Sequence, residues 1–321
     1  MGRIVLAAIL LATIAFPQGN RPATTSLGGP LRLRDQGSFY VNGKIAGPTN
    51  GESVINQMYV QYWIPEAQGT LPPVIMVHGS SHTGKTYETT PDGREGWATY
   101  FVRQQIPVYV VDLPGRARAG FDSSAVSRGP ISRFNDQSAW VTFRIGPAPF
   151  EPFPTTQFPV EAKEQYFAQL VPNSEATLTN AGTVQADGLI ALLDKIGPSI
   201  VMVHSMSGAQ GIGAAVARPN LVKALVTVEP VSCGASDADV AKTFKTVPVL
   251  AVWGDFKDAF IDRGLTQCGS LVARATAAGG RAKLLHLPEE GFVGNSHMLM
   301  MDRNNLKVAD RIIAWLRETV K

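Results

Sequence analysis

The sequence predicts an α/β fold in which a mostly parallel central sheet is covered by helices on both faces. Short β-branched apolar runs, such as 73–77, 108–111 and 200–203, alternate along the chain with segments of helical spacing. Strands that are apolar along their whole length are typical of parallel sheets buried on both faces. The 321 residues, 45% of them hydrophobic, suffice to bury such a core in a single domain.

The N-terminus has the pattern of a secretory signal peptide. Met1-Gly2-Arg3 gives a charged start, and the apolar run 4–16 that follows is too short for a membrane-spanning helix. We expect residues 1–19 to be removed, at a cleavage site that the sequence does not define, and residues 20–321 to form a secreted or periplasmic domain. An uncleaved membrane anchor is the alternative.

The net charge limits the kinds of binding partner, and the two cysteines limit the kinds of cross-link or metal site. A formal net charge of +3, without a long run of Lys or Arg, argues against a nucleic-acid surface and against a polybasic membrane patch. Cys233 and Cys268 are the two cysteines of the chain. One disulfide between them and two buried thiols are both open, whereas a metal site would need clustered ligands that the sequence lacks.

The region 37–63 is expected to be an antiparallel lead-in to the sheet. Asn42-Gly43 is a two-residue hairpin signal between the runs 37–41 and 44–46, and 54–63 alternates as a longer strand. The next expected elements are a buried strand over 73–77 that ends in His78-Gly79-Ser80-Ser81, a helix over 97–105 and a strand over 108–111.

Between Arg116 and Asn173 the alternation of strands and helices stops. A cluster of prolines between 147 and 159 lies among aromatic residues, and the segment is too apolar for a disordered linker. A long irregular segment inside a compact domain is usually a lid or a binding loop, so we expect an insertion over the rim of the sheet. A surface excursion without a role in substrate binding is the alternative.

The regular alternation then resumes and continues to the C-terminus. The remaining expected elements are helices over 179–196, 208–217, 265–278 and 306–319, and strands over 224–228, 247–253 and 282–287.

A candidate nucleophile stands in the stretch 200–213, where a buried strand meets a helix of small residues. In the motif G-x-S-x-G, a Ser occupies a strained turn between a strand and a helix, which exposes its hydroxyl. Here Val203 replaces the first Gly and Ser207 the second, with Gly208 one position later. The pattern favours Ser205 as the nucleophile. Ser207 is the alternative register, and an ordinary buried strand before a helix is the interpretation without function.

A Ser nucleophile needs a base, and His297 is the best placed of the five His residues. It lies in the loop between the last expected strand and the closing helix. The other four are less suitable: His204 adjoins Ser205 and would point away from it, His78 belongs to a strand-end turn, His286 lies in a strand and His82 lies in a loop that looks mobile.

The acid that orients this base has candidates after two different strands. Glu229 ends one strand, and Pro230 is expected to restrict its backbone to extended geometry. The commoner arrangement places the acid after the next strand, but there Lys257 stands between Asp255 and Asp258. A carboxylate on a strand end is held more rigidly than one in a loop, which favours Glu229.

Four stretches together, V-H-S-M-S-G, His78-Gly79, V-E-P and N-S-H-M, resemble the α/β-hydrolase superfamily. More narrowly, they resemble the exported bacterial carboxylesterases of the esterase 713 type, over most of the chain from Gly37 onward. The resemblance implies an α/β-hydrolase fold with a cap-like lid insertion over 116–173. It also implies a catalytic triad of Ser205, His297 and Glu229.

The same resemblance implies an oxyanion hole formed by the backbone N–H groups of Ser80 and Met206. In that group a vicinal cysteine pair follows His-Gly, whereas this chain has Ser80-Ser81, so stiffening of the hole by such a disulfide is absent here. No metal and no organic cofactor are implied.

The expected function is hydrolysis of a carboxylic ester through an acyl-serine intermediate. An acyltransferase or a lactonase would use the same triad, and a non-catalytic binding protein would keep only the scaffold. The expected partner is a small-molecule ester rather than nucleic acid or a membrane, and a homodimer is left open. The acyl and alcohol groups of the ester depend on the shape of the insertion.

Overall fold

The computed structural model describes residues 28–46, 53–120, 131, 133–173, 178, 180–256 and 258–320. The signal peptide predicted for residues 1–19 lies outside the described residues. None of the helices in the described part of the chain combines the length and the apolar character that a membrane span requires.

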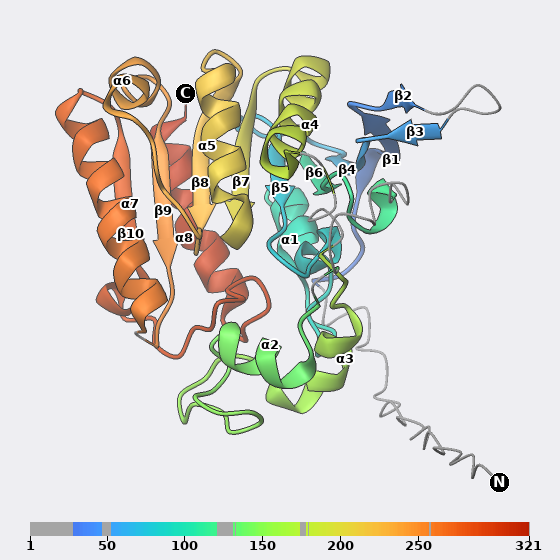
Figure 1. Ribbon diagram of the computed structural model, residues 1–321, viewed down its shortest axis with the longest axis vertical. Coiled ribbons are helices and arrows are strands. Elements are labelled where there is room, and N and C mark those ends of the chain that lie inside the picture. Colours follow the sequence, from blue (N-terminus) through green and yellow to red (C-terminus); the bar gives the residue numbers. More distant parts are fainter. Residues whose placement is uncertain are drawn as a thin grey trace, which may run out of the picture.

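An eight-stranded sheet forms the centre of the described structure, in the order β1-β4-β6-β5-β7-β8-β9-β10 (Figure 1). The strands from β6 to β10 in this order run parallel to one another, whereas β4 is antiparallel to both β1 and β6. The predicted fold class is therefore confirmed. The strands are β1 (Leu33–Val41), β4 (Met58–Pro65), β5 (Val74–Val77), β6 (Val108–Asp112), β7 (Ser199–His204), β8 (Val222–Val228), β9 (Val249–Trp253) and β10 (Ala282–His286).

Helices cover both faces of the sheet (Figure 1). Each face has its own hydrophobic core. Met202 and Val203 are neighbours in β7, yet they belong to the two different cores, because successive side chains of a strand point to opposite faces. Every residue of β7 is buried, which explains why its sequence is apolar without alternation. The main helices are α1 (Trp97–Arg103) and α8 (Asn305–Thr319) on one face, and α4 (Ala181–Ile196), α5 (Gly208–Ala217) and α7 (Ala259–Ala277) on the other; the short α6 (Asp237–Asp239) precedes α7.

The N-terminal lead-in differs from the predicted hairpin. β1 pairs with β4, while β2 (Lys44–Ala46) pairs with β3 (Ser53–Ile55) in a separate two-stranded sheet. The strand predicted over 54–63 is also divided, because Asn56 adopts a φ of 61° between β3 and β4. Asn42 has a φ of 61° as well, so the Asn-Gly signal does mark a turn. That turn directs the chain away from β1 instead of pairing the two runs that flank it.

The segment 116–173, called the insertion from here on, carries the short helices α2 (Asp136–Thr142) and α3 (Lys163–Ala168). Both lie beyond one end of the strands, at the bottom of Figure 1. Backbone hydrogen bonds attach the insertion to the loop after β10: the N–H of His297 donates to the C=O of Phe143 at 2.9 Å, and the N–H of Gln157 donates to the C=O of Gly294 at 2.7 Å. The described part of the insertion is thus tied to the main domain through its main chain.

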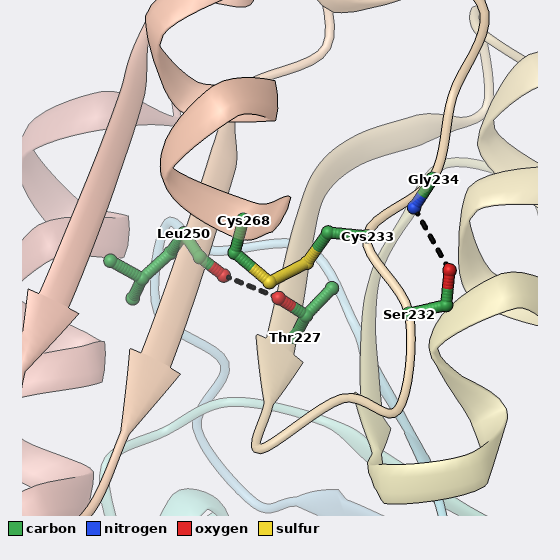
Figure 2. Close-up of a disulfide and its surroundings, with 6 residues drawn as sticks. All are labelled: Thr227, Ser232, Cys233, Gly234, Leu250 and Cys268. Atoms are coloured by element: carbon green, nitrogen blue, oxygen red, sulfur yellow. Dashed lines mark hydrogen bonds between the residues drawn. A yellow bond between two sulfur atoms is a disulfide. The ribbon is translucent and has the colours of Figure 1, made fainter. Parts of the chain in front are cut away.

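Cys233 and Cys268 form a disulfide, the first of the two alternatives that the sequence left open. The bond joins the segment after β8 to α7, over a sequence separation of 35 residues (Figure 2). Both residues are buried in the core that contains α7. The cross-link therefore ties the chain just beyond Glu229 to the helix that covers the neighbouring strand.

Removing the disulfide should destabilise the fold. Replacement of both cysteines by Ala should lower the free energy of unfolding by about 3 to 4 kcal/mol, because the unfolded chain regains the freedom that a cross-link over a loop of this size removes. Urea unfolding measures the loss. The unmutated protein unfolded under reducing conditions is the matched control and should lose a similar amount. Equal free energies of unfolding for the disulfide-bonded protein and the double Ala variant would contradict a structural role for the bond.

Candidate active site

Ser205 lies on the turn between β7 and α5, as the motif predicts. Its φ is +53°, a left-handed conformation that costs a non-glycine residue about 1 to 2 kcal/mol and is typical of a nucleophile elbow. The side chain stands against the loop after β5, where a Cβ added to Gly79 would lie 2.7 Å from the Cβ of Ser205. The Gly at position 79 therefore makes room for this close approach.

Ser207, the alternative nucleophile, has a structural role. Its Oγ donates to the C=O of His78 at 2.5 Å, and the residue is fully buried. The small residues after it serve packing, because a Cβ added to Gly211 would lie 2.7 Å from Cγ1 of Val203. Since the hydroxyl of Ser207 is already engaged and shielded, the geometry favours the register on Ser205.

Glu229 and His297 are in direct contact, although 68 residues separate them in the sequence. Nδ1 of His297 lies 3.1 Å from Oε2 of Glu229, and the other carboxylate oxygen accepts the N–H of Gly254 at 2.6 Å. Because Oε2 can only accept, the proton of the neutral imidazole lies on Nδ1 and Nε2 carries the free lone pair. This arrangement suits His297 to act as a base through Nε2.

Burial and charge act in opposite directions on the pKa values of this pair. Burial raises the pKa of Glu229, but Arg144 and His297 lower it more, so that the carboxyl titrates below its usual range. Burial lowers the pKa of His297 below its usual value, against the raising effect of Glu229. At neutral pH the acid is therefore ionised and the imidazole is neutral, which is the charge state that a general base requires.

The ends of β7 and β8 place Ser205 and Glu229 at matching positions. His204 pairs with Val228, so each candidate residue lies one position beyond the last pair of the two strands. Glu229 has a φ of +48°, which corrects the extended geometry expected from Pro230. Contacts of the side chain thus outweigh the local preference of a residue before proline. Strained non-glycine residues of this kind cluster at functional sites.

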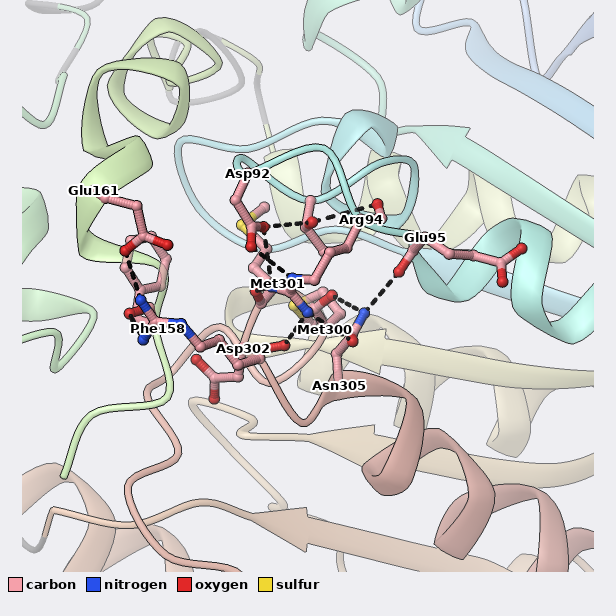
Figure 3. A network of polar contacts seen from close by, with 11 residues as sticks. Asp92, Arg94, Glu95, Phe158, Glu161, Met300, Met301, Asp302 and Asn305 are labelled. Atoms are coloured by element: carbon pink, nitrogen blue, oxygen red, sulfur yellow. Dashed lines mark hydrogen bonds and ion pairs between the residues drawn. The ribbon is translucent and has the colours of Figure 1, made fainter. Parts of the chain in front are cut away.

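A polar network holds the loop that carries His297. The buried carboxylate of Asp302 accepts hydrogen bonds from the side chain of Asn295 and from both the N–H and the hydroxyl of Ser296. Arg94 reaches this loop from the segment before α1 and donates to the C=O groups of Met301 and Asp302 at 2.9 and 3.0 Å (Figure 3). Burial raises the pKa of Asp302 to about 7. The loop is therefore held by buried polar contacts rather than by a regular element.

The two residues expected to form the oxyanion hole lie in the loop after β5 and on the turn after β7. None of the described residues accepts a hydrogen bond from the N–H of Ser80. Met206 belongs to the first turn of the short helix η7 (Ser205–Ser207), where backbone donors have no partner within a helix. Oδ1 of Asn173 accepts from the N–H of Ser81 at 2.7 Å and from Oγ of Ser80 at 3.1 Å. Asn173 thus braces the loop in which a cysteine pair is absent.

Two other histidines lie close to the candidate site, and one of them differs from expectation. His82 is not in a mobile loop: it is fully buried, its Nδ1 donates to the C=O of Ser80 at 2.7 Å and its ring packs edge-on against Phe143. Burial lowers the pKa of His82 to about 3. His204, which was expected to point away from Ser205, contacts the base: its Nε2 donates to the C=O of His297 at 3.0 Å and the two rings lie 4.7 Å apart. Both residues support the loops of the candidate site.

The alternative acids are engaged elsewhere. The carboxylate of Asp255 accepts the N–H groups of Phe256 and Gly294, and Asp258 caps α7 by accepting the N–H of Ile261. Lys257 lies outside the described residues. Among the hydrogen bonds of the described chain, neither Asp reaches His297. Within the same residues, no group of three or more His, Cys, Asp or Glu side chains forms a set of metal ligands.

A cavity of about 740 Å³ lies in the insertion. None of the three candidate triad residues lines it, but an aromatic chain leads from it to the base. The ring of Phe134 lies 5.3 Å from that of Phe143, which stacks on His297 at 5.7 Å with an interplanar angle of 14°. The apolar wall consists of Phe134, Phe150, Phe167, Ala168 and Leu170, and the polar wall of Arg133, Asn135, Asp136, Lys163 and Glu164.

Comparisons with known proteins lead to the same fold. A model of the alpha/beta hydrolase family matches residues 74–285. The chain is 27% identical to phiG, a probable secreted lipase of a fungal species, over 89% of this chain and 92% of the relative. The solved structure of a bacterial esterase is 36% identical, with a TM-score of 0.84, over 91% of this chain and 98% of the other. A predicted hydrolase from Thermoplasma acidophilum, 13% identical over 88% of this chain and 100% of the other, shares the fold with a TM-score of 0.50.

The contacts of the three carboxylates lead to a test of the acid. Glu229→Gln should lower kcat for an activated aryl ester by up to about ten-thousandfold, because an amide no longer holds the tautomer of His297 or stabilises the imidazolium. Asp255→Asn and Asp258→Asn are matched controls and should keep most of the activity. Rates are normalised to the folded fraction, since Glu229→Gln also removes the partner of a buried Arg. Collapse of one Asp variant beside an active Glu229→Gln would refute the assignment.

Proposed function

Because the chain belongs to the alpha/beta hydrolase family, we propose that it is a serine carboxylesterase that works through an acyl-serine intermediate. The contact between His297 and Glu229 carries the proposal, because a His in contact with a buried carboxylate, at the end of the strand next to the turn of Ser205, is suited to act as the base for that Ser. The similarity to a bacterial esterase and to a probable secreted lipase supports ester hydrolysis as the reaction class.

In the proposed mechanism, His297 accepts the proton of the Ser205 hydroxyl through Nε2 while the oxygen attacks the ester carbonyl. The buried carboxylate of Glu229 stabilises the imidazolium that forms. The N–H groups of Ser80 and Met206 receive the negative oxygen of the tetrahedral intermediate. His297 then gives its proton to the leaving alcohol, and a water molecule activated by the same base releases the acid from the acyl-enzyme.

We further propose that the insertion acts as a cap that receives the larger apolar group of the ester. The aromatic wall of its cavity supports this role, because ligand sites are typically apolar hollows with a few polar groups. The stacking of Phe143 between this wall and His297 connects the cavity to the site of the chemistry. The substrate class that fits is a small-molecule ester with a hydrophobic chain or ring.

Export is also part of the proposal. The charged start and short apolar run of residues 1–19 support it, as does the description of the fungal relative as secreted. A buried disulfide agrees with folding in an oxidising compartment, because such bonds are rare in reducing ones.

Covalent labelling tests the nucleophile. Ser205→Ala should abolish both ester turnover and labelling by a fluorophosphonate, because the reaction with either compound requires the same hydroxyl. Ser207→Ala is the matched control and should keep both, at a cost of about 1 kcal/mol in stability for the lost hydrogen bond to His78. Mass spectrometry of the labelled peptide identifies the residue. A label on Ser207, or an active Ser205→Ala variant, would reject this nucleophile.

A series of esters of graded chain length tests the cavity. Phe150→Ala and Phe167→Ala should lower kcat/KM for the longer esters more than for the shortest, by about 10- to 200-fold per lost apolar contact. Phe153→Ala is the matched control: this aromatic residue of the insertion stacks on Phe256 and does not line the cavity. An equal loss for every ester would show that the cavity wall supports only the fold.

A further inference from the structure

One side chain of the insertion contacts the candidate acid directly. Arg144 follows α2, and its Nη2 donates to Oε2 of Glu229 at 2.6 Å. This oxygen is the one that His297 contacts at 3.1 Å. Nε of the same guanidinium donates to the C=O of Asp255 at 3.3 Å. The insertion, the loops after β8 and β9, and the loop of His297 therefore meet around a single carboxylate.

This arrangement is unfavourable for folding alone. Arg144 is only 3% exposed and Glu229 is fully buried, so both charges have lost their contact with water. Nη1 of Arg144 has no hydrogen-bond partner among the described residues, and the backbone of Arg144 has a φ of +53°. Apolar side chains of similar volume often replace a buried ion pair without loss of stability. A buried, incompletely paired Arg on a strained backbone thus needs a reason beyond packing.

The residue before Arg144 holds the base. The ring of Phe143 stacks on the imidazole of His297, and its C=O accepts the backbone N–H of His297 at 2.9 Å. Two consecutive residues of the insertion therefore contact the two members of the base–acid pair, one each.

We propose that Arg144 is a positioning residue of the reaction: it fixes the carboxylate of Glu229 for His297 and balances the charge of the pair. The insertion is then part of the catalytic machinery as well as a cover over the substrate. This inference rests on the proposed serine esterase function, because it assigns a role to Arg144 through Glu229 and His297.

The charges around the pair determine the direction of the expected effect. Glu229 raises the pKa of His297, whereas the charge of Arg144 lowers it. Loss of the positive charge should therefore raise the pKa of His297, and protonation should inactivate the base at a higher pH than in the unmutated enzyme. The other titratable groups around the pair are Asp258 at the start of α7, Asp255 after β9, His204 at the end of β7 and His82 in the loop after β5, and burial keeps the pKa of both histidines below the usual range.

The test compares Arg144→Gln with Arg144→Lys in the full chain, with an activated aryl ester as substrate. Arg144→Gln should lower kcat by about 10- to 100-fold, as the loss of a partner that orients a metal-bound ligand does, and should move the acid limb of the kcat/KM profile to higher pH. Arg144→Lys keeps the charge but loses the fork of donors. The acid limb of Arg144→Lys should match that of the unmutated enzyme, and its kcat should fall less than that of Arg144→Gln.

A matched control separates positioning from stability. Arg103, the last residue of α1, forms another partly buried ion pair, with Glu95 at 2.6 Å. Arg103→Gln breaks this pair and should change neither kcat nor the acid limb. The inference would be overturned if Arg144→Gln kept both the acid limb and kcat of the unmutated enzyme. It would also be overturned if the loss of activity only matched the loss of folded protein. If Arg144→Gln does not fold, Arg144→Lys decides: a lower kcat at unchanged KM in folded protein supports the role, and an unmutated kcat overturns it.

Labelling of the unmutated protein by a fluorophosphonate distinguishes a failure of the proposed function from a failure of the role of Arg144. No label on Ser205 would overturn the proposed function, and the inference with it. A labelled Ser205 together with Arg144 variants that behave like the unmutated enzyme would overturn only the role of Arg144.

Discussion

The buried carboxylate of Glu229 is the constraint on which the rest of the candidate site depends. An ionised carboxylate without access to water is stable only where hydrogen bonds and opposite charge replace its hydration. Here the N–H of Gly254, the imidazole of His297 and the guanidinium of Arg144 supply that replacement. A Cβ added at Gly254 would lie 2.9 Å from Oε1 of Glu229, so a larger residue there would displace the carboxylate. Three loops are thus held in place by one negative charge.

The parallel sheet brings this charge next to the candidate nucleophile. Parallel neighbours end at the same edge, and the register of β7 and β8 puts Ser205 and Glu229 at corresponding positions beyond that edge. Both residues adopt left-handed backbones, which are strained for residues other than Gly. The close packing of α5 on β7 at Gly211 and the disulfide between Cys233 and α7 hold the segments that follow these turns. Rigid surroundings therefore maintain two strained residues side by side.

The parts of this structure that the sequence predicts are those that local pattern determines. Strands buried on both faces have to be apolar throughout, so the runs around 75, 110, 202 and 250 were found within one or two residues of their observed bounds. The Asn42-Gly43 turn was found, but a local turn signal does not tell which strand pairs with β1. In the structure that partner is β4, which follows later in the chain. The extended backbone predicted at Glu229 was wrong because contacts with distant residues outweigh the local preference of a residue before proline.

Arg144 was missed for a related reason, and it shows what the insertion adds to the fold. It lies in an irregular segment, 85 residues before the carboxylate that it contacts, and no spacing rule connects the two. The same short segment contains Phe143, which contacts His297 on one side and Phe134 of the cavity wall on the other. Contacts that would select a substrate and contacts that orient the base–acid pair thus share one stretch of main chain. Under the proposed function, a group bound against the cavity wall would therefore be separated from His297 only by the rings of Phe134 and Phe143.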